Sequence, residues 1–257
     1  MVSPFSIPKC IVHIPHTSRH IPLEFRDQFL LSDADLMVEL IRMTDGHTDD
    51  LFSFPPQEVR ALRFPMSRLL VDPERFEDDA REIMVPKGMG VLYTKTAHGD
   101  SLRRSLSSTE RTRLLECFYR PHHARLTELV DDTLASHNRC LILDAHSFPS
   151  RPLPYEWDQS QNRPEICIGA DSFHTPKELE EACVNGFLAR GYSVEVNRPF
   201  KGSLVPMAHF QVDRRVSSIM VEIRRDLYMD ELTGRKIPRF KSIKKDLCCI
   251  LQGLWGS

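Results

Sequence analysis

The sequence lacks the features that would place it in several common classes of protein. No apolar run among its 257 residues approaches the roughly 20 residues that a membrane span needs. The net charge of −2 provides no basic footprint for nucleic acid. The first residues lack the basic start and apolar core of a signal peptide. We therefore expect no membrane or nucleic-acid partner and a cytoplasmic location.

The cysteines show no arrangement typical of disulfides or structural zinc. There are seven of them, an odd number, and no Cys-x-x-Cys pair occurs. Cys140 and Cys167 lie in apolar runs, where a thiol behaves as a small hydrophobic group. The pattern indicates reduced thiols, as expected of a cytosolic protein.

Internal repeats and low-complexity linkers are also absent, and short apolar runs alternate instead with helical patterns. Strands are expected at residues 9–14, 59–64, 140–145, 165–169, 192–197 and 218–224. Helices are expected at residues 33–43, after a Ser32 cap, and at residues 109–136, with a kink near Pro121. A third helix is expected to start with Thr175 as its cap and Pro176 in its first turn and to end at Gly191, and a fourth is expected at residues 242–254.

Strands separated by helices predict an α/β fold with a largely parallel sheet that is covered on both faces. We expect one domain spanning residues 1–257. Residues 88–108 contain three glycines with several arginines and serines, and they predict an irregular excursion that could lie over a site.

Two of the expected strands run up to a histidine, His16 in one case and His146 in the other. Ligands of open α/β sheets bind just beyond the carboxyl ends of the strands. The sequence has no His-Glu-x-x-His motif, so any metal site must be assembled from distant segments. The two histidines therefore predict a metal site assembled across the sheet.

A third ligand is expected because a catalytic zinc usually takes three protein ligands and keeps a fourth position for water. Asp45, His47 and Asp49 are the candidates, all from residues 44–51. The alternative is a solvated loop with a helix cap. Asp144 lies two residues before His146, so on a strand both side chains point the same way, and Asp144 can orient the histidine.

Glu222 is unusual because it lies between Val221 and Ile223 in a run that otherwise appears buried. A buried carboxylate is costly unless it is paired or placed for function. It fits a general base in a metal hydrolase. The alternative is an ion pair with Arg224 on the same strand face.

Two polar segments are candidates for substrate binding. Arg68 and Arg75 can grip a carboxylate in a bidentate way, although an internal ion pair with Asp72 or Glu74 is the stronger expectation from composition. Asn197 and Lys201 lie in a glycine-containing loop after a strand, which can also be an ordinary turn. His122, on the apolar face of its helix, is expected to be a core histidine.

Seven segments, in order and covering residues 10–231, resemble the N-formylglutamate amidohydrolase (N-formylglutamate deformylase) family. They are residues 14–18, 43–49, 64–75, 119–123, 144–147, 197–202 and 222–231. The resemblance implies a fold similar to zinc carboxypeptidases (phosphorylase/hydrolase-like), with a mixed, mostly parallel sheet of the eight-stranded type between helices.

The same resemblance implies a zinc-dependent hydrolase that splits N-formyl-L-glutamate, or a related N-acyl acidic amino acid, at the end of histidine degradation. It makes His16, Asp45 and His146 the metal ligands and Glu222 the general base. It makes Arg68, Arg75, Asn197 and Lys201 the substrate-binding candidates. An arginine near the zinc (Arg68, Arg224 or Arg225) would stabilise the oxyanion. The rivals are a metallocarboxypeptidase, another N-acyl amino acid hydrolase, and a non-catalytic binding protein of this fold.

Overall fold

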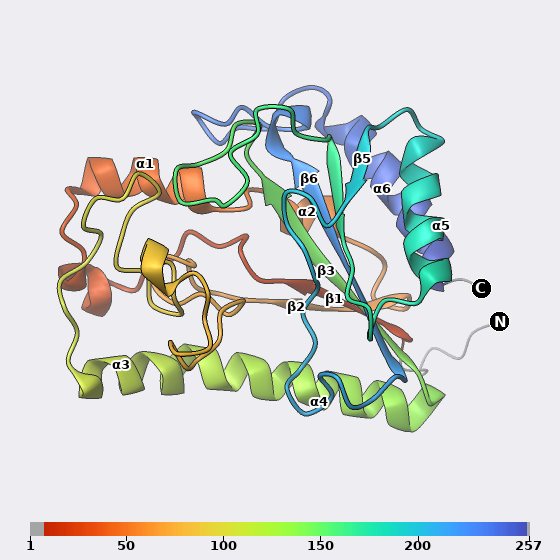
Figure 1. The fold of residues 1–257 in the computed structure, drawn as a ribbon, viewed down its shortest axis with the longest axis horizontal. Helices are drawn as coiled ribbons and strands as arrows, with labels where there is room; N and C mark the ends of the chain where they lie inside the picture. The colour runs from red at the N-terminus through yellow and green to blue at the C-terminus, as the bar shows by residue number, and fades with distance from the viewer. Residues whose placement is uncertain (1–7, 256–257) are drawn as a thin grey trace.

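Six strands form one sheet in the computed structural model, which describes residues 8–255 (Figure 1). The strands are β1 (Cys10–Ile14), β2 (Val59–Arg63), β3 (Cys140–Phe148), β4 (Ile166–Gly169), β5 (Val194–Val196) and β6 (Val216–Arg224). Each corresponds to one of the six strands expected from the sequence. The implied eight-stranded type is wrong for the described residues, because prolines and glycines keep the long segments after β2 and β5 irregular.

The strand order is β2-β1-β3-β6-β4-β5. β1 pairs in parallel with β2 on one side and with β3 on the other, and β3 pairs in parallel with β6. β4 runs antiparallel to β6 and carries β5 at the edge. The predicted α/β fold with a mixed, mostly parallel sheet is therefore confirmed. The chain leaves β1 for β2 and returns to β3 on the other side of β1, so the strand order reverses there.

Helices cover both faces of the sheet, as expected. The principal helices are α1 (Asp33–Met43), α2 (Thr48–Leu51), α3 (Ser108–Leu114), α4 (Arg120–His137), α5 (Lys177–Leu188) and α6 (Phe240–Trp255). Short helical turns are η1 (Leu23–Gln28), η2 (Val85–Lys87), the π-helical η3 (Leu115–Tyr119) and η4 (Arg225–Leu227). Within residues 8–255, no helix is both long and apolar enough to cross a membrane.

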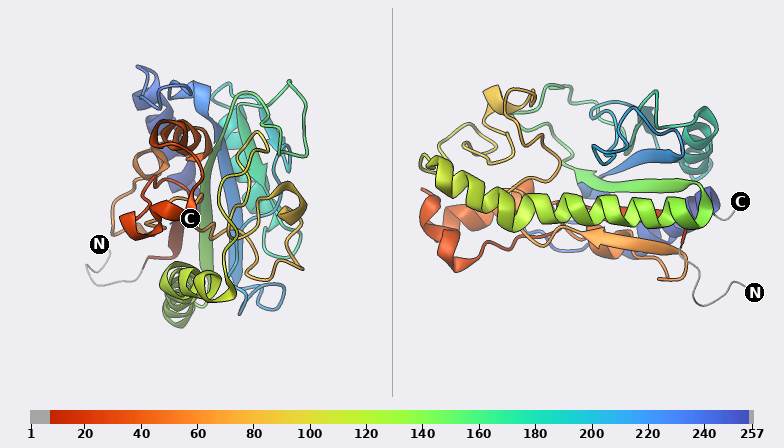
Figure 2. Two further views of the ribbon diagram at one scale, coloured as in Figure 1. Left: turned by 90° about the vertical axis from the view of Figure 1, so that its left-hand side faces the viewer. Right: turned by 90° about the horizontal axis from the view of Figure 1, so that it is seen from below.

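The alternation of side chains along the strands decides which helix covers which face. Val12 and Val221 belong to the core that includes residues of α2, α5 and α6. Ile11 and Ile142 point the other way and pack against α4, which lies along the sheet when seen from below (Figure 2). The face that α4 covers also carries the polar side chains of the candidate site.

Two helix predictions can be compared with the structure in detail. α3, η3 and α4 follow one another without interruption, and the π-helical turn stands just before Pro121, whose nitrogen has no hydrogen to donate. The expected Thr175 cap is wrong. Pro176 occupies the N-cap position of α5, and the Thr175 hydroxyl donates to the Ser218 carbonyl instead (2.7 Å). The Ser32 cap of α1 is confirmed.

A second hydrophobic core lies beside the sheet, between α1 and α3, the two helices at the left of Figure 1. It contains much of the irregular excursion at residues 88–108, including Met89, Val91 and the fully buried Tyr93. The expectation of irregular structure there is confirmed, and the segment packs as core through these side chains. The loop that carries Arg68 and Arg75 is anchored in this core by Leu69, Leu70 and Val71.

Candidate active site

The two histidines singled out from the sequence meet at the carboxyl ends of adjacent strands. His16 follows β1 by two residues, whereas His146 lies inside β3, which extends to Phe148 rather than stopping at the histidine. β1 and β3 flank the point where the strand order reverses, which is where α/β sheets bind ligands. The register places Glu222 of β6 directly beside His146, so both project from the same face of the sheet.

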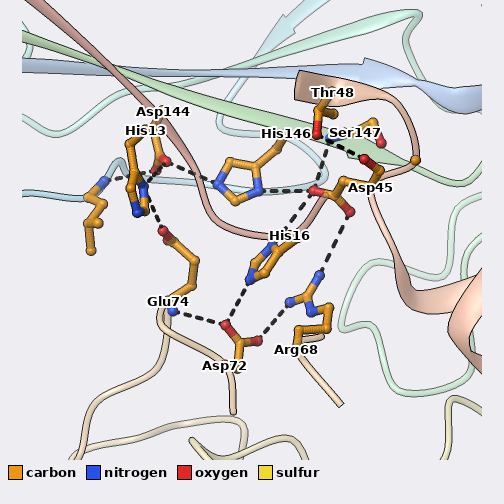
Figure 3. Close-up of polar contacts among 12 residues, drawn as sticks. His13, His16, Asp45, Thr48, Arg68, Asp72, Glu74, Asp144, His146 and Ser147 are labelled. Atoms are coloured by element: carbon orange, nitrogen blue, oxygen red, sulfur yellow. Dashed lines mark hydrogen bonds and ion pairs between the residues drawn. The ribbon is translucent and has the colours of Figure 1, made fainter. Parts of the chain in front are cut away.

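Asp45 joins the two histidines in a buried cluster (Figure 3). The Nδ1 atom of His146 lies 3.2 Å from Asp45 Oδ2, and the Nδ1 atom of His16 lies 3.6 Å from it. All three residues are at most 5% exposed. Imidazole nitrogen and carboxylate oxygen are ligands that zinc accepts, and the three ligand atoms lie within 4.8 Å of one another. The cluster can therefore hold a metal ion.

The remaining candidates for the third ligand are engaged elsewhere. Asp49 accepts a hydrogen bond from the Thr17 hydroxyl (3.0 Å), and His47 bonds the Gly234 carbonyl (2.9 Å). Asp45 comes just after α1, and its backbone N–H donates to the His16 carbonyl (3.0 Å). This backbone contact brings the end of α1 to the end of β1.

The hydrogen bonds of the two imidazoles also fit a metal. The Nε2 atom of His16 lies 2.8 Å from Asp72 Oδ1, and that of His146 lies 3.1 Å from Asp144 Oδ1. When each Nε2–H donates to its carboxylate, each Nδ1 lone pair faces the cluster, the arrangement usual for metal-ligating histidines. The Nδ1 atom of His16 is buried and has no hydrogen-bond partner within residues 8–255.

Arg225 determines which carboxylate oxygen of Asp45 faces the two histidines. Its Nη2 donates to Asp45 Oδ1 (2.8 Å), which leaves Oδ2 for the histidines. Its other nitrogens donate to the carbonyl of Arg42 (2.6 Å) and the hydroxyl of Ser147 (3.2 Å). Burial alone would raise the pKa of Asp45, but its contacts with His146 and His16 and the charge of Arg225 hold that pKa well below its usual range. Asp45 is therefore an ionised carboxylate.

Glu222 is a buried carboxylate that has no ion-pair partner within residues 8–255. It is 7% exposed, and its Oε2 atom has no hydrogen-bond partner in the described part of the chain. Burial raises the pKa of Glu222 to about 8, with Asp45 adding to the rise and His146 opposing it. The alternative of a pair with Arg224 is wrong, because Arg224 donates to Asp226 instead (2.8 Å).

The loop after β2 places its arginines around Asp72. Arg68 donates to Asp72 Oδ2 (2.9 Å), and its Nη1 lies 3.9 Å from Asp45 Oδ1. Arg75 lies farther from Asp72, with 3.7 Å between its Nε and Asp72 Oδ2. This Nε atom has no hydrogen-bond partner among residues 8–255. The internal ion pair expected from composition is thus present, and it is tight for Arg68 and loose for Arg75.

Asn197 and Lys201 lie on the loop after β5, and both are exposed. The Asn197 side chain accepts hydrogen bonds from the backbone N–H groups of Ala170 (2.8 Å) and Gly202 (3.1 Å). The loop then returns to the sheet, where the Leu204 N–H donates to Asp144 Oδ2 (3.1 Å). Asn197 therefore shapes a loop that borders the candidate site.

Sequence reasoning did not find three of these contacts. It placed Asp72 only as a partner for arginine, missed the Tyr93 hydroxyl that bonds Asp72, and considered Arg225 only for the oxyanion. Asp72 and Arg225 each lie in one of the seven segments that resemble the family, but no sequence pattern there predicts which residue either one contacts. Tyr93 comes from the irregular excursion, for which the sequence predicts no contacts.

The chain is similar to proteins of one family. The model of the N-formylglutamate amidohydrolase family matches residues 9–229. The N-formylglutamate deformylases of Pseudomonas putida and Pseudomonas aeruginosa are 24% and 28% identical to it, over 86% and 77% of this chain and 82% and 76% of theirs.

Solved structures match the fold over nearly the whole chain. The crystal structure of N-formylglutamate amidohydrolase from Ralstonia eutropha has a TM-score of 0.83 at 23% identity, covering 98% of this chain and 95% of that one. A gene product of Agrobacterium tumefaciens has a TM-score of 0.64 at 19% identity, covering 97% and 92%. At these identities the likeness establishes a shared fold.

Proposed function

The chain belongs to the N-formylglutamate amidohydrolase family, and from that premise we propose that it hydrolyses the formyl amide of N-formyl-L-glutamate, or of a related N-acyl acidic amino acid. The products are formate and L-glutamate. The observation that carries the proposal is the buried cluster of His16, Asp45 and His146 with the unpaired carboxylate of Glu222 beside it. The names of the two deformylases of Pseudomonas support the substrate.

We assign the metal to the Nδ1 atoms of His16 and His146 and to Asp45 Oδ2, and we propose zinc. A bound zinc ion supplies Lewis-acid polarisation of the formyl carbonyl and a water molecule whose pKa is lowered to roughly 7. Three protein ligands leave a position free for substrate or water, as catalytic sites require. The orphaned Nδ1 of His16 is the feature of this chain that favours a cation there.

Glu222 is the proposed general base. Its side chain shares a face with His146 and has an oxygen free of other bonds, so it can take a proton from the attacking water. The protonated carboxyl then passes that proton to the amine nitrogen as the C–N bond breaks. A pKa raised by burial suits both steps, because the group must accept the proton and then release it.

Arginines supply the remaining positive charge. Arg225 is fully engaged with Asp45 and backbone carbonyls, and Arg224 pairs with Asp226, so Arg68 is the best placed of the three to stabilise the oxyanion. Arg75, with an unpartnered Nε, is the proposed receptor for a substrate carboxylate. Asn197 and Lys201 remain proposed contacts from the neighbouring loop.

The wider setting follows from this substrate. We propose that residues 1–257 form one domain, and that the enzyme acts in the cytoplasm, at the end of histidine degradation. The family match over residues 9–229 supports the single domain, and the release of glutamate fits the final step of such a route.

The test is a comparison of substrates with the purified full chain. We expect zinc in the protein and faster turnover of N-formyl-L-glutamate than of N-formyl-L-aspartate or N-acetyl-L-glutamate. Cleavage of a C-terminal peptide residue instead would identify a carboxypeptidase. Zinc binding without turnover of any of these compounds would favour a binding protein.

A further inference from the structure

A second cluster of metal-capable side chains lies next to the first (Figure 3). His13 of β1 and Asp144 of β3 are register partners, and Glu74 reaches them from the loop after β2. The Nδ1 atom of His13 lies 2.9 Å from Asp144 Oδ1 and 3.2 Å from Glu74 Oε1. These spacings are slightly shorter than those of the His16 cluster, where the Nδ1 atoms of His146 and His16 lie 3.2 and 3.6 Å from Asp45 Oδ2.

The charges of the two clusters differ in how they are balanced. In the first cluster Asp45 pairs with Arg225, and the adjoining Asp72 pairs with Arg68. For Asp144 and Glu74, no lysine or arginine nitrogen of residues 8–255 lies within 4 Å, and histidine is their ion-pair partner. Two carboxylates thus converge on one imidazole, with His13 and Asp144 fully buried.

The contact that His13 makes through Nε2 allows its Nδ1 to act as a metal ligand. His13 Nε2 lies 2.9 Å from Nε2 of His122, the core histidine expected from the sequence. When His13 donates its proton to His122, the lone pair on Nδ1 points between the two carboxylate oxygens. Three electron-rich atoms at these distances repel one another unless a positive charge, either a metal ion or a proton, lies among them.

We propose that His13, Glu74 and Asp144 bind a second divalent cation, of the zinc class that takes imidazole nitrogen and carboxylate oxygen. Its two positive charges match the two carboxylates. The competing occupant is a single proton on His13 Nδ1, which balances only one of them.

The proposed cation would fasten the active-site loop to the sheet. The backbone N–H of Glu74 donates to Asp72 Oδ1 (2.9 Å), the same oxygen that accepts from His16. Asp144 Oδ1 faces both His13 and His146. The second site therefore adjoins partners of both histidines of the first cluster, without being part of the proposed hydrolysis.

The experiment is a count of bound metal in the full chain. The wild type, Glu74→Gln, His13→Gln and Asp45→Asn are dialysed against buffered zinc and measured by inductively coupled plasma mass spectrometry, with circular dichroism to confirm folding. We expect about two equivalents in the wild type and about one in each variant. The matched control is Glu77→Gln, which changes an exposed glutamate of the same loop that pairs with Arg120 and should keep both equivalents.

The outcomes separate this site from the catalytic one. One equivalent in the wild type that survives Glu74→Gln but is lost in Asp45→Asn overturns the second site and leaves the proposed hydrolase intact. Two equivalents in Glu74→Gln also overturn it. A wild type that binds no zinc contradicts both metal sites. Glu74 is partly exposed, so its variant remains informative if His13→Gln fails to fold.

Discussion

The ends of the parallel strands and the loops beside them hold their polar groups in different ways. His16, His146 and Glu222 are at most 7% exposed, and strand register or hydrogen bonds to neighbouring carboxylates position them. The proposed substrate-binding residues stand on the loops after β2 and β5, where Arg75 is 21% exposed and Lys201 is exposed. The strands and the segment just after β1 therefore fix the two histidines and the proposed base, and the loops carry Arg68 and the groups proposed for recognition.

This difference predicts two kinds of mutational effect. Changes at the strand ends should alter kcat or metal affinity, because those groups meet the reacting atoms. Changes on the loops should alter KM, because those groups meet the rest of the substrate. If changes in both regions altered kcat and KM alike, the proposed division between strand ends and loops would be wrong.

The largest effect is expected from Glu222→Gln. The amide cannot accept a proton, so kcat should fall by about 10²- to 10⁴-fold while the zinc content stays the same. Steady-state kinetics with N-formyl-L-glutamate, together with metal analysis, measure both quantities. Native turnover in this variant would remove Glu222 from the mechanism.

Asp144→Asn should weaken the proposed catalytic metal site through His146 and remove a ligand from the proposed second site. An amide is a weaker acceptor for the Nε2–H of His146, and loss of such a partner typically costs about 10- to 100-fold in metal affinity. Competition with a chromogenic zinc chelator measures the change. Asp226→Asn, which alters an exposed aspartate paired with Arg224, is the control and should bind zinc normally.

The pKa of Glu222 should report the cation directly. Burial raises this pKa to about 8 without a metal. A cation in the adjacent cluster favours the ionised carboxylate, so loading zinc should lower the pKa by about one unit or more, a tenfold change in proton affinity. Carboxyl carbon NMR of metal-free and zinc-loaded protein across pH gives both values, and Glu222→Gln assigns the signal. An unchanged pKa would place the cation elsewhere.

Arg75→Met should weaken substrate binding. Loss of one charge-assisted hydrogen bond predicts a rise in KM of about tenfold, with kcat nearly unchanged. Arg120→Met, which removes an exposed arginine paired with Glu77, should leave both constants alone. A fall in kcat with KM constant would move Arg75 from recognition to chemistry.

The smallest effect is expected from Lys201→Met. An exposed ammonium is screened by water and salt, so KM should rise by less than about threefold and the rise should vanish at high ionic strength. Lys241→Met on α6 is the control for a change in net charge. A tenfold rise would show that the loop after β5 closes onto the substrate.

Much of the fold was predictable because local patterns specify it. All six strands and the Ser32-capped α1 appear where apolar runs and a capping residue predicted them. The Thr175 cap failed because its hydroxyl bonds Ser218, which is distant in sequence and invisible to local rules. The extension of β3 past His146 likewise depends on pairing with β6 rather than on its own residues.

The sequence predicted most residues of the candidate site, but it did not predict which of them contact one another. Two strand-end histidines and a carboxylate inside an apolar run are visible in one dimension, and the order of seven segments indicates the family. The choice of Asp45 among three neighbours has a physical basis only in three dimensions, where its backbone meets His16 and Arg225 occupies its other oxygen.

The sequence alone determined the fold class, the residue types of a candidate metal site and the family to which the chain belongs, because periodicity and motif order can be read along the chain. Tertiary structure decided which of those residues meet. Asp72 accepts a hydrogen bond from His16, Asp144 accepts one from His146, and Glu74 lies close to His13. These contacts form because the crossover from β1 through β2 to β3 brings three distant segments to the carboxyl ends of the strands. Together those contacts join separate polar residues into one largely buried network.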